Sequence, residues 1–196
     1  MIEFQQATFL ISAAKVEQLP PDTGVEVAIV GRSNAGKSSV LNILTGQKQL
    51  ARTSKTPGRT QLINLFSIDD KRRLVDLPGY GFAKVAESIK IQWQKTLSQY
   101  LQERKSLKGL LLVMDCRHPF RDTDCSVIDW CLESNLPCHI LLNKADKLSY
   151  SQQKTCLMQA EKAIAEDNIV SVQLFSTFNR LGVDTLKKHL QAWYKI

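Results

Sequence analysis

The segment VEVAIVGRSNAGKSS, residues 25–39, joins a largely apolar run to a lysine bracketed by small residues. Residues 31–38 fit G-x-x-x-x-G-K-[ST], between a predicted strand (25–30) and a predicted helix (37–45). Small residues let backbone N–H groups converge on phosphate oxygens, and the helix N-terminus adds positive potential. The segment therefore predicts a phosphate-binding loop in an α/β fold. The loop consists of Gly31, Arg32, Ser33, Asn34, Ala35, Gly36, Lys37 and Ser38.

Side chains from two loops are predicted to meet the terminal phosphates and Mg²⁺. In the first loop, Lys37 reaches the β- and γ-phosphates and Ser38 offers its hydroxyl to Mg²⁺. The second loop ends the predicted strand RRLVDL: Asp76 can hold Mg²⁺ through water, and the Gly79 N–H can sense a γ-phosphate. This second loop consists of Asp76, Leu77, Pro78 and Gly79.

A third loop predicts which base the site binds. It ends the predicted strand 138–143, at the carboxyl edge where open α/β sheets bind ligands. An ionised Asp146 only accepts hydrogen bonds; guanine presents N1–H and a 2-amino group as donors, whereas adenine presents an acceptor. The loop therefore favours GTP and GDP and disfavours the alternative of a P-loop kinase or ATPase. It consists of Asn143, Lys144, Ala145 and Asp146.

Outside these loops, short apolar runs alternate with longer amphipathic stretches, which predicts a doubly wound α/β fold. Residues 61–68 and 72–77 form a predicted hairpin, and unbroken apolar runs predict parallel strands at 107–115 and 138–143. We expect a mostly parallel six-stranded sheet with one antiparallel edge strand and helices on both faces. Further elements are predicted at 87–105, 122–134 and 151–166 (helices), at 170–175 (a strand) and around Leu186, Leu190 and Trp193 (a closing helix).

The chain of 196 residues predicts a single folded domain. The segment QLPPDTG, residues 18–24, separates an N-terminal extension (1–24) from the main domain (25–196), and the apolar stretch 9–14 favours packing of that extension. Five cysteines without a C-x-x-C pair indicate free thiols, and the start lacks the pattern of a signal peptide. We therefore expect a cytoplasmic monomer without a membrane segment.

The sequence resembles the EngB (YihA/YsxC) family of the TrmE-Era-EngA-EngB-septin-like GTPase superfamily. The segments GRSNAGKSS, TSKTPGRTQLIN, DLPGYGFA and NKADKL match that family's pattern over nearly the whole length. The resemblance implies a P-loop GTPase fold, the G domain, that binds GTP, GDP and Mg²⁺.

The resemblance also implies two further nucleotide-binding segments. The effector segment consists of Gly58, Arg59, Thr60, Gln61 and Leu62. Thr60 would complete the Mg²⁺ shell beside Ser38 and Asp76, with Thr56 as the competing residue. The last guanine contact falls on Phe175, Ser176 and Thr177.

Hydrolysis is predicted to be slow because Tyr80 stands where Ras-like enzymes carry a water-orienting glutamine. The alternative for Tyr80 is simple packing in the switch. Related GTPases that use K⁺ have an asparagine at the position of Asn34, so K⁺ is a candidate cofactor that would act with Lys37 on the developing charge.

The whole net charge of +7 arises in residues 51–110, which carry 12 basic and 5 acidic side chains. We expect this excess to surround the loops that sense the γ-phosphate and to bind RNA, although a charged segment can also be a merely solvated face. The resemblance implies the large ribosomal subunit or its rRNA as the partner during assembly, with an association to normal cell division and septation. DNA is not expected. The alternative is a GTP-dependent regulator of a cell-division protein without direct RNA contact.

Overall fold

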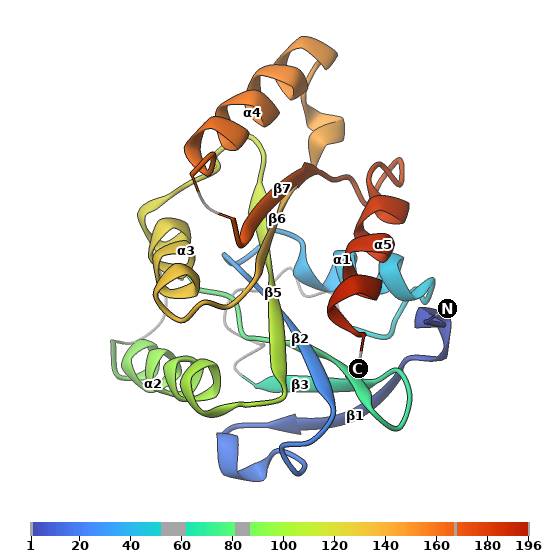
Figure 1. Cartoon of the computed structure of the whole chain (residues 1–196), viewed down its shortest axis with the longest axis vertical. Coiled ribbons are helices and arrows are strands. Elements are labelled where there is room, and N and C mark those ends of the chain that lie inside the picture. Colours follow the sequence, from blue (N-terminus) through green and yellow to red (C-terminus); the bar gives the residue numbers. More distant parts are fainter. Residues whose placement is uncertain (1, 52–61, 81–86, 167, 196) are drawn as a thin grey trace.

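The computed structural model describes residues 2–51, 62–80, 87–166 and 168–195. These residues form a seven-stranded sheet in the order β1-β3-β4-β2-β5-β6-β7, with helices on both faces (Figure 1). The strands are β1 (Thr8–Ala13), β2 (Val25–Gly31), β3 (Ile63–Ser67), β4 (Arg72–Asp76), β5 (Leu107–Asp115), β6 (Cys138–Asn143) and β7 (Val170–Leu174). The α-helices are α1 (Lys37–Thr45), α2 (Glu87–Glu103), α3 (Asp122–Glu133), α4 (Tyr150–Ala163) and α5 (Val183–Trp193). Short 3₁₀ turns are η1 (Phe4–Gln6), η2 (Val16–Gln18) and η3 (Ala145–Lys147).

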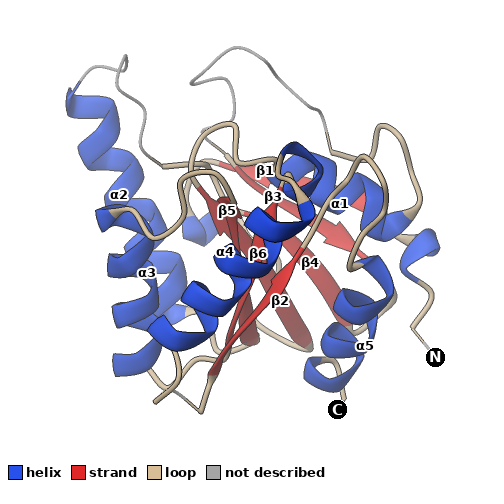
Figure 2. Cartoon of the chain, turned by 90° about the horizontal axis from the view of Figure 1, so that it is seen from above, coloured by secondary structure: helices blue, strands red, loops and turns tan. Residues whose placement is uncertain are grey.

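The sheet is covered by two sets of helices, each over its own hydrophobic core. Leu41 of α1 and Leu186 of α5 pack with one face of the sheet, whereas Tyr100 of α2, Ile128 of α3 and Ala160 of α4 pack with the other. Figure 2 shows α1 and α5 on one side of the sheet and α2 and α3 on the other. The central strands β2, β5 and β6 are buried on both sides, which explains why their sequences are mostly apolar. None of the helices within the described ranges combines the length and the apolar character that crossing a bilayer requires.

The predicted α/β fold is confirmed, with the parallel order β4-β2-β5-β6-β7 and an antiparallel hairpin of β3 and β4. The sheet has seven strands, one more than the six predicted, and its edge strand is antiparallel as expected but is β1 rather than a strand of the hairpin. Strand β1 from the N-terminal extension pairs antiparallel with β3 and covers it, with a bulge between Phe9 and Ile11. Phe9 remains 55% exposed and Leu10 45% exposed, so β1 joins the sheet mainly through backbone hydrogen bonds and lacks the buried apolar alternation that reveals a strand.

The sheet places the carboxyl ends of its parallel strands along one edge. Strand register pairs Ile29 of β2 with Asp76 of β4, and Asp115 of β5 with Asn143 of β6. Because β2, β4 and β6 each lead directly into one of the three predicted loops, these loops come together at this edge, as expected for an open α/β sheet.

Candidate nucleotide-binding site

Residues 31–38 connect β2 to α1 through a loop with two residues in the left-handed region. The angle φ is 62° at Asn34 and 104° at Gly36. A Cβ atom at Gly36 would collide with Asn143 Nδ2, so only glycine fits there. Such turns direct successive N–H groups into a concave anion site, and α1 begins at Lys37, so its positive N-terminal end adjoins the loop. The predicted phosphate loop therefore has the backbone geometry that its chemistry requires.

Lys37 and Asp76 lie together beneath this loop. The Lys37 ammonium donates to Gly31 O at 3.3 Å. Burial lowers the pKa of Lys37 and raises the pKa of Asp76 to about 6, and the attraction between the two groups opposes both shifts. Asp76 Oδ1 is buried and has no hydrogen-bond partner among the described residues. A buried carboxylate oxygen of this kind needs a cation or a water ligand, so Asp76 fits the predicted Mg²⁺ role, with the Ser38 hydroxyl in the first turn of α1 as the neighbouring oxygen donor.

Only part of the predicted effector segment lies within the described residues. Only Leu62 of that segment is described, and its side chain is 39% exposed. The competing metal ligands Thr56 and Thr60 lie outside the described residues, together with Gly58, Arg59 and Gln61. Their roles stay predictions.

The last side chain of β6 and the first one after it tie the base-recognition loop to the phosphate loop. Asn143 Nδ2 donates to Ala35 O at 2.8 Å, and Lys144 Nζ donates to Asn34 O at 2.7 Å. Lys144 is in the left-handed region, with φ at 65°. The structure therefore brings together two motifs that are more than 100 residues apart in the sequence.

The carboxylate of Asp146 is held by the loop after β7. Its Oδ1 accepts a hydrogen bond of 2.6 Å from Ser176 Oγ, and its Oδ2 lies 3.2 Å from Lys147 Nζ. The Ser176 hydroxyl is the largest cause of the lowered pKa of Asp146, and Lys147 adds to it. Asp146 is therefore ionised at neutral pH and can only accept hydrogen bonds from a base.

The backbone of the loop after β7 is fixed next to Asp146. Phe175 O accepts from Ala145 N at 3.1 Å, and Phe175 N donates to Leu142 O at 2.9 Å. Phe175 and Ser176 are fully buried, and Thr177 is half-buried. This arrangement places the predicted triplet beside the predicted base-recognition carboxylate.

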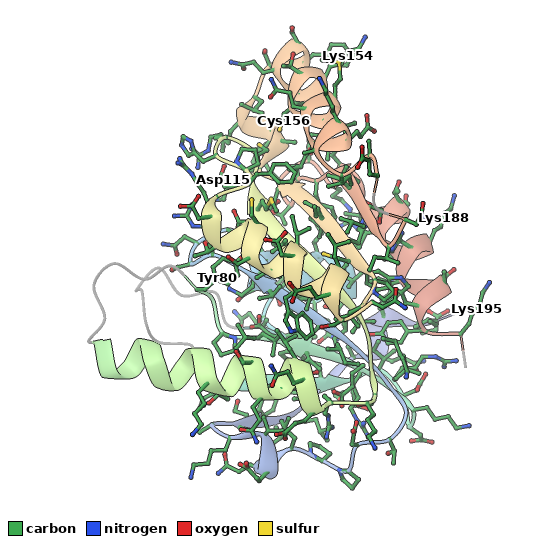
Figure 3. All side chains as sticks on the ribbon, turned by 60° about the vertical axis from the view of Figure 1, so that its left-hand side comes forward. Tyr80, Asp115, Lys154, Cys156, Lys188 and Lys195 are labelled. Carbon is green, nitrogen blue, oxygen red and sulfur yellow. The ribbon has the colours of Figure 1, made fainter. Side chains whose placement is uncertain are left out.

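Asp115, at the end of β5, belongs to this site although no sequence motif indicated it. It accepts from Lys144 Nζ at 3.0 Å and from Arg117 Nη2 at 2.6 Å. Burial alone would raise the pKa of Asp115, but these hydrogen bonds outweigh it and hold the pKa well below its usual range. Figure 3 shows Asp115 where β5 ends. The sequence carried one indication of this role: Asp115 lies at the end of a predicted strand, as Asp76 and Asn143 do.

Part of the basic excess lies away from this site. Lys71 O accepts from Val25 N at 2.8 Å, and Arg72 pairs in register with Val25, at the amino end of β2. Arg72 forms an ion pair with Asp69, and Arg104 forms one with the buried Glu26. The expectation that the whole excess surrounds the γ-phosphate loops is therefore wrong for the residues at this opposite edge of the sheet, which are Lys71, Arg72, Arg73, Arg104, Lys105 and Lys108. Arg52, Lys55, Arg59 and Lys84 lie outside the described residues.

A mostly parallel sheet that gathers these three loops at its carboxyl edge is the architecture of P-loop GTP-binding proteins. A family model described as "50S ribosome-binding GTPase" matches residues 26–144, more than half of the chain. The protein is therefore a member of the GTPase class, and guanine nucleotides with Mg²⁺ are its expected ligands.

Comparison with individual proteins identifies the family within this class. The chain is 53% identical over 192 residues to the probable GTP-binding protein EngB of Enterobacter sp. (strain 638), covering 97% of this chain and 92% of the relative. It is 53% identical over 194 residues to the probable EngB of Idiomarina loihiensis, covering 98% and 94%. The chain belongs to the EngB family of GTP-binding proteins, which confirms the resemblance found in the sequence.

Solved structures support the fold. A crystal structure of a probable GTP-binding protein EngB superposes with a TM-score of 0.70 at 18% identity, covering 87% of this chain and 98% of that one. An Aquifex aeolicus Era variant bound to GDP·AlF₄⁻ gives a TM-score of 0.70 at 23% identity, covering 89% and 58%.

Proposed function

We propose that this protein is a GTP-dependent switch that binds the large ribosomal subunit during its assembly and hydrolyses GTP slowly. The observation that carries the nucleotide part is the ionised Asp146, oriented by Ser176 beside the phosphate loop. Two charge-assisted hydrogen bonds from guanine to this carboxylate would select GTP and GDP. The link to cell division that the resemblance implies would then follow from subunit assembly.

The ribosomal part of the proposal is supported by charge and by the family. The matched family model is described as ribosome-binding, and all of the net positive charge arises in residues 51–110. Neutralising RNA phosphates requires this sign and makes binding depend on salt. Exposed lysines at the amino edge of the sheet, such as Lys71 and Lys105, extend the basic surface beyond the nucleotide site.

We expect the protein to cosediment with isolated large ribosomal subunits more strongly with a non-hydrolysable GTP analogue than with GDP. Binding should weaken steeply as salt rises, because RNA contacts release counterions. The measurement is pelleting across nucleotide states and salt concentrations, with isolated small subunits as the control. Equal binding in both nucleotide states would contradict a switch, and native complexes that survive nuclease would favour a protein partner in cell division.

Slow hydrolysis follows in this proposal from Tyr80, which is buried and donates its hydroxyl to Asp124. A phenol does not orient a water molecule as a glutamine amide would, whether or not Asp124 holds its hydroxyl. Asn34, exposed on the phosphate loop, is the residue that we propose to ligate K⁺, which would supply positive charge between the β- and γ-phosphates.

Replacing Na⁺ by K⁺ at equal ionic strength should raise the single-turnover rate of GTP hydrolysis by roughly tenfold or more, the scale of one added charge contact in the transition state. Asn34→Ala should remove the difference between the two salts without removing GDP binding. Quenched-flow measurement of phosphate release checks this. Equal wild-type rates in both salts would exclude K⁺ from the mechanism.

A further inference from the structure

The turn that follows β4 is folded onto the phosphate loop. Ser33 N donates to Tyr80 O at 2.9 Å, and Tyr80 N donates to Gly31 O at 3.3 Å. Tyr80 thereby forms a parallel bridge with Arg32. The first of these hydrogen bonds uses the Ser33 N–H group of the phosphate loop, which would otherwise be available to a phosphate oxygen.

Gly79 lies directly against the lysine of the phosphate loop. A Cβ atom on Gly79 would come within 2.7 Å of Lys37 Nζ and 3.3 Å of Ser33 N. In a GTP complex, the Lys37 ammonium and the Gly79 N–H would contact the γ-phosphate between them. Because Gly79 packs on Lys37 and Tyr80 O occupies Ser33 N, a third phosphate held by both groups would take the space of the turn, whereas GDP ends at the β-phosphate.

The side chain of Tyr80 fixes this turn to α3. Its ring is 5% exposed, and its hydroxyl donates to Asp124 Oδ1 at 2.6 Å. Figure 3 shows Tyr80 next to α3. Asp124 is 1% exposed, and its second oxygen accepts from Arg121 N at 3.1 Å at the start of that helix. Burial, with the negative charge of Asp124, raises the pKa of Tyr80, so the hydroxyl keeps its proton and stays the donor.

A tyrosine that is held at both ends restricts the backbone that carries it. The side chain has only two χ torsions, so a fixed hydroxyl leaves the main chain little freedom to move. The bond to Asp124 at one end and the hydrogen bonds to Gly31 and Ser33 at the other therefore support the same position of the turn. Moving Gly79 away from Lys37 would strain or break the Tyr80–Asp124 contact.

We propose that Tyr80 and Asp124 are positioning residues that set the preference between GDP and GTP, by holding the Gly79–Tyr80 turn where a γ-phosphate must enter. The contact favours the GDP state, and GTP binds by displacing the turn and releasing the tyrosine. This inference deepens the proposed switch and rests on it. It also assigns a role to Tyr80, which stands where Ras-like enzymes carry a water-orienting glutamine.

Tyr80→Phe tests the contact because it removes the hydroxyl and keeps the ring. We expect the affinity for a non-hydrolysable GTP analogue, relative to that for GDP, to rise roughly tenfold, the effect of losing one buried hydrogen bond to a charged group. Asp124→Ala should raise the ratio similarly, and the double variant should add little to either, because both remove the same bond. Asp129→Asn, at an exposed position of the same helix, should leave the ratio unchanged. Titration with fluorescent nucleotides measures both affinities.

The outcomes separate this inference from the proposed switch. Asp124→Ala also removes the acceptor for Arg121 N and could therefore unfold the protein. Thermal unfolding without nucleotide establishes whether each variant is folded. If Asp124→Ala is unfolded, Tyr80→Phe alone tests the inference. An unchanged or lowered ratio in folded Tyr80→Phe overturns the inference and leaves GDP binding intact. Failure of the wild type to bind either guanine nucleotide overturns the proposed function itself.

Discussion

Replacing Asp146 by asparagine should reduce the affinity for both GTP and GDP by about a thousandfold and create affinity for xanthine nucleotides. The ionised carboxylate accepts from two guanine donors, and losing two charge-assisted hydrogen bonds is worth about 3–6 kcal/mol. Xanthine carries a carbonyl where guanine carries its amino group, so the amide of the new side chain can donate to it while its oxygen accepts from N1–H. Competition of GTP, XTP and ATP against labelled GDP measures the exchange of specificity.

Ser176→Ala is the matched control for this substitution. It removes the 2.6 Å hydrogen bond to Asp146 Oδ1 but keeps the carboxylate. We therefore expect a loss of GDP affinity of about tenfold, the scale of one hydrogen bond to a charged group, and no gain for XTP. If Asp146→Asn bound GTP as tightly as the wild type, or if the wild type bound ATP as tightly as GTP, the carboxylate would not be the group that reads the base.

The loops of this site could be predicted because each is contiguous in the sequence and follows an apolar strand. Residues 31–38 carry their own turn chemistry in Gly36 and their own charge in Lys37, and the sheet only has to bring such loops to one edge. The three loops therefore appear at the positions expected from the sequence, and so do the helices that follow them.

Features that depend on long-range pairing could not be predicted in this way. Strand β1 pairs with β3 through backbone groups that any sequence possesses, and its burial has no period of two. The bond between Tyr80 and Asp124 joins residues 44 positions apart. Neither residue belongs to a recurring motif that would reveal the other, so only the folded chain shows that the turn after β4 is tied to α3.

Glu26 is the strongest example, because it lies inside the apolar strand that predicted the fold. It is fully buried, and its carboxylate accepts from Arg104 Nη2 at 2.7 Å and from Tyr100 Oη at 2.9 Å. Arg73 Nη1 lies 3.4 Å away. These partners come from the end of α2, the segment after it and the start of β4, so one buried acid joins three parts of the chain at the edge opposite the nucleotide site.

Glu26→Gln should lower the free energy of unfolding by about 3 kcal/mol, since it leaves the buried guanidinium of Arg104 with only the partly exposed Asp22, 3.6 Å from its Nε, as a counter-charge. The amide is nearly isosteric and can still accept from Tyr100 Oη, so the loss reports the charge rather than a cavity. Urea denaturation followed by circular dichroism measures it. Glu103→Gln makes the same chemical change at an exposed position one residue before Arg104, and should alter the free energy by less than about 0.5 kcal/mol.

A double replacement distinguishes the cost of an unpaired charge from the worth of the pair. Glu26→Leu with Arg104→Met removes both charges together, and apolar replacements of buried ion pairs often cost little. We expect this variant to be more stable than Glu26→Gln, although Tyr100 Oη then loses its acceptor. Because the pair lies at the amino edge of the sheet, nucleotide affinity should be unchanged in every folded variant. A Glu26→Gln protein as stable as Glu103→Gln would mean that Asp22 or water is a sufficient partner for Arg104 once the Glu26 carboxylate is neutralised.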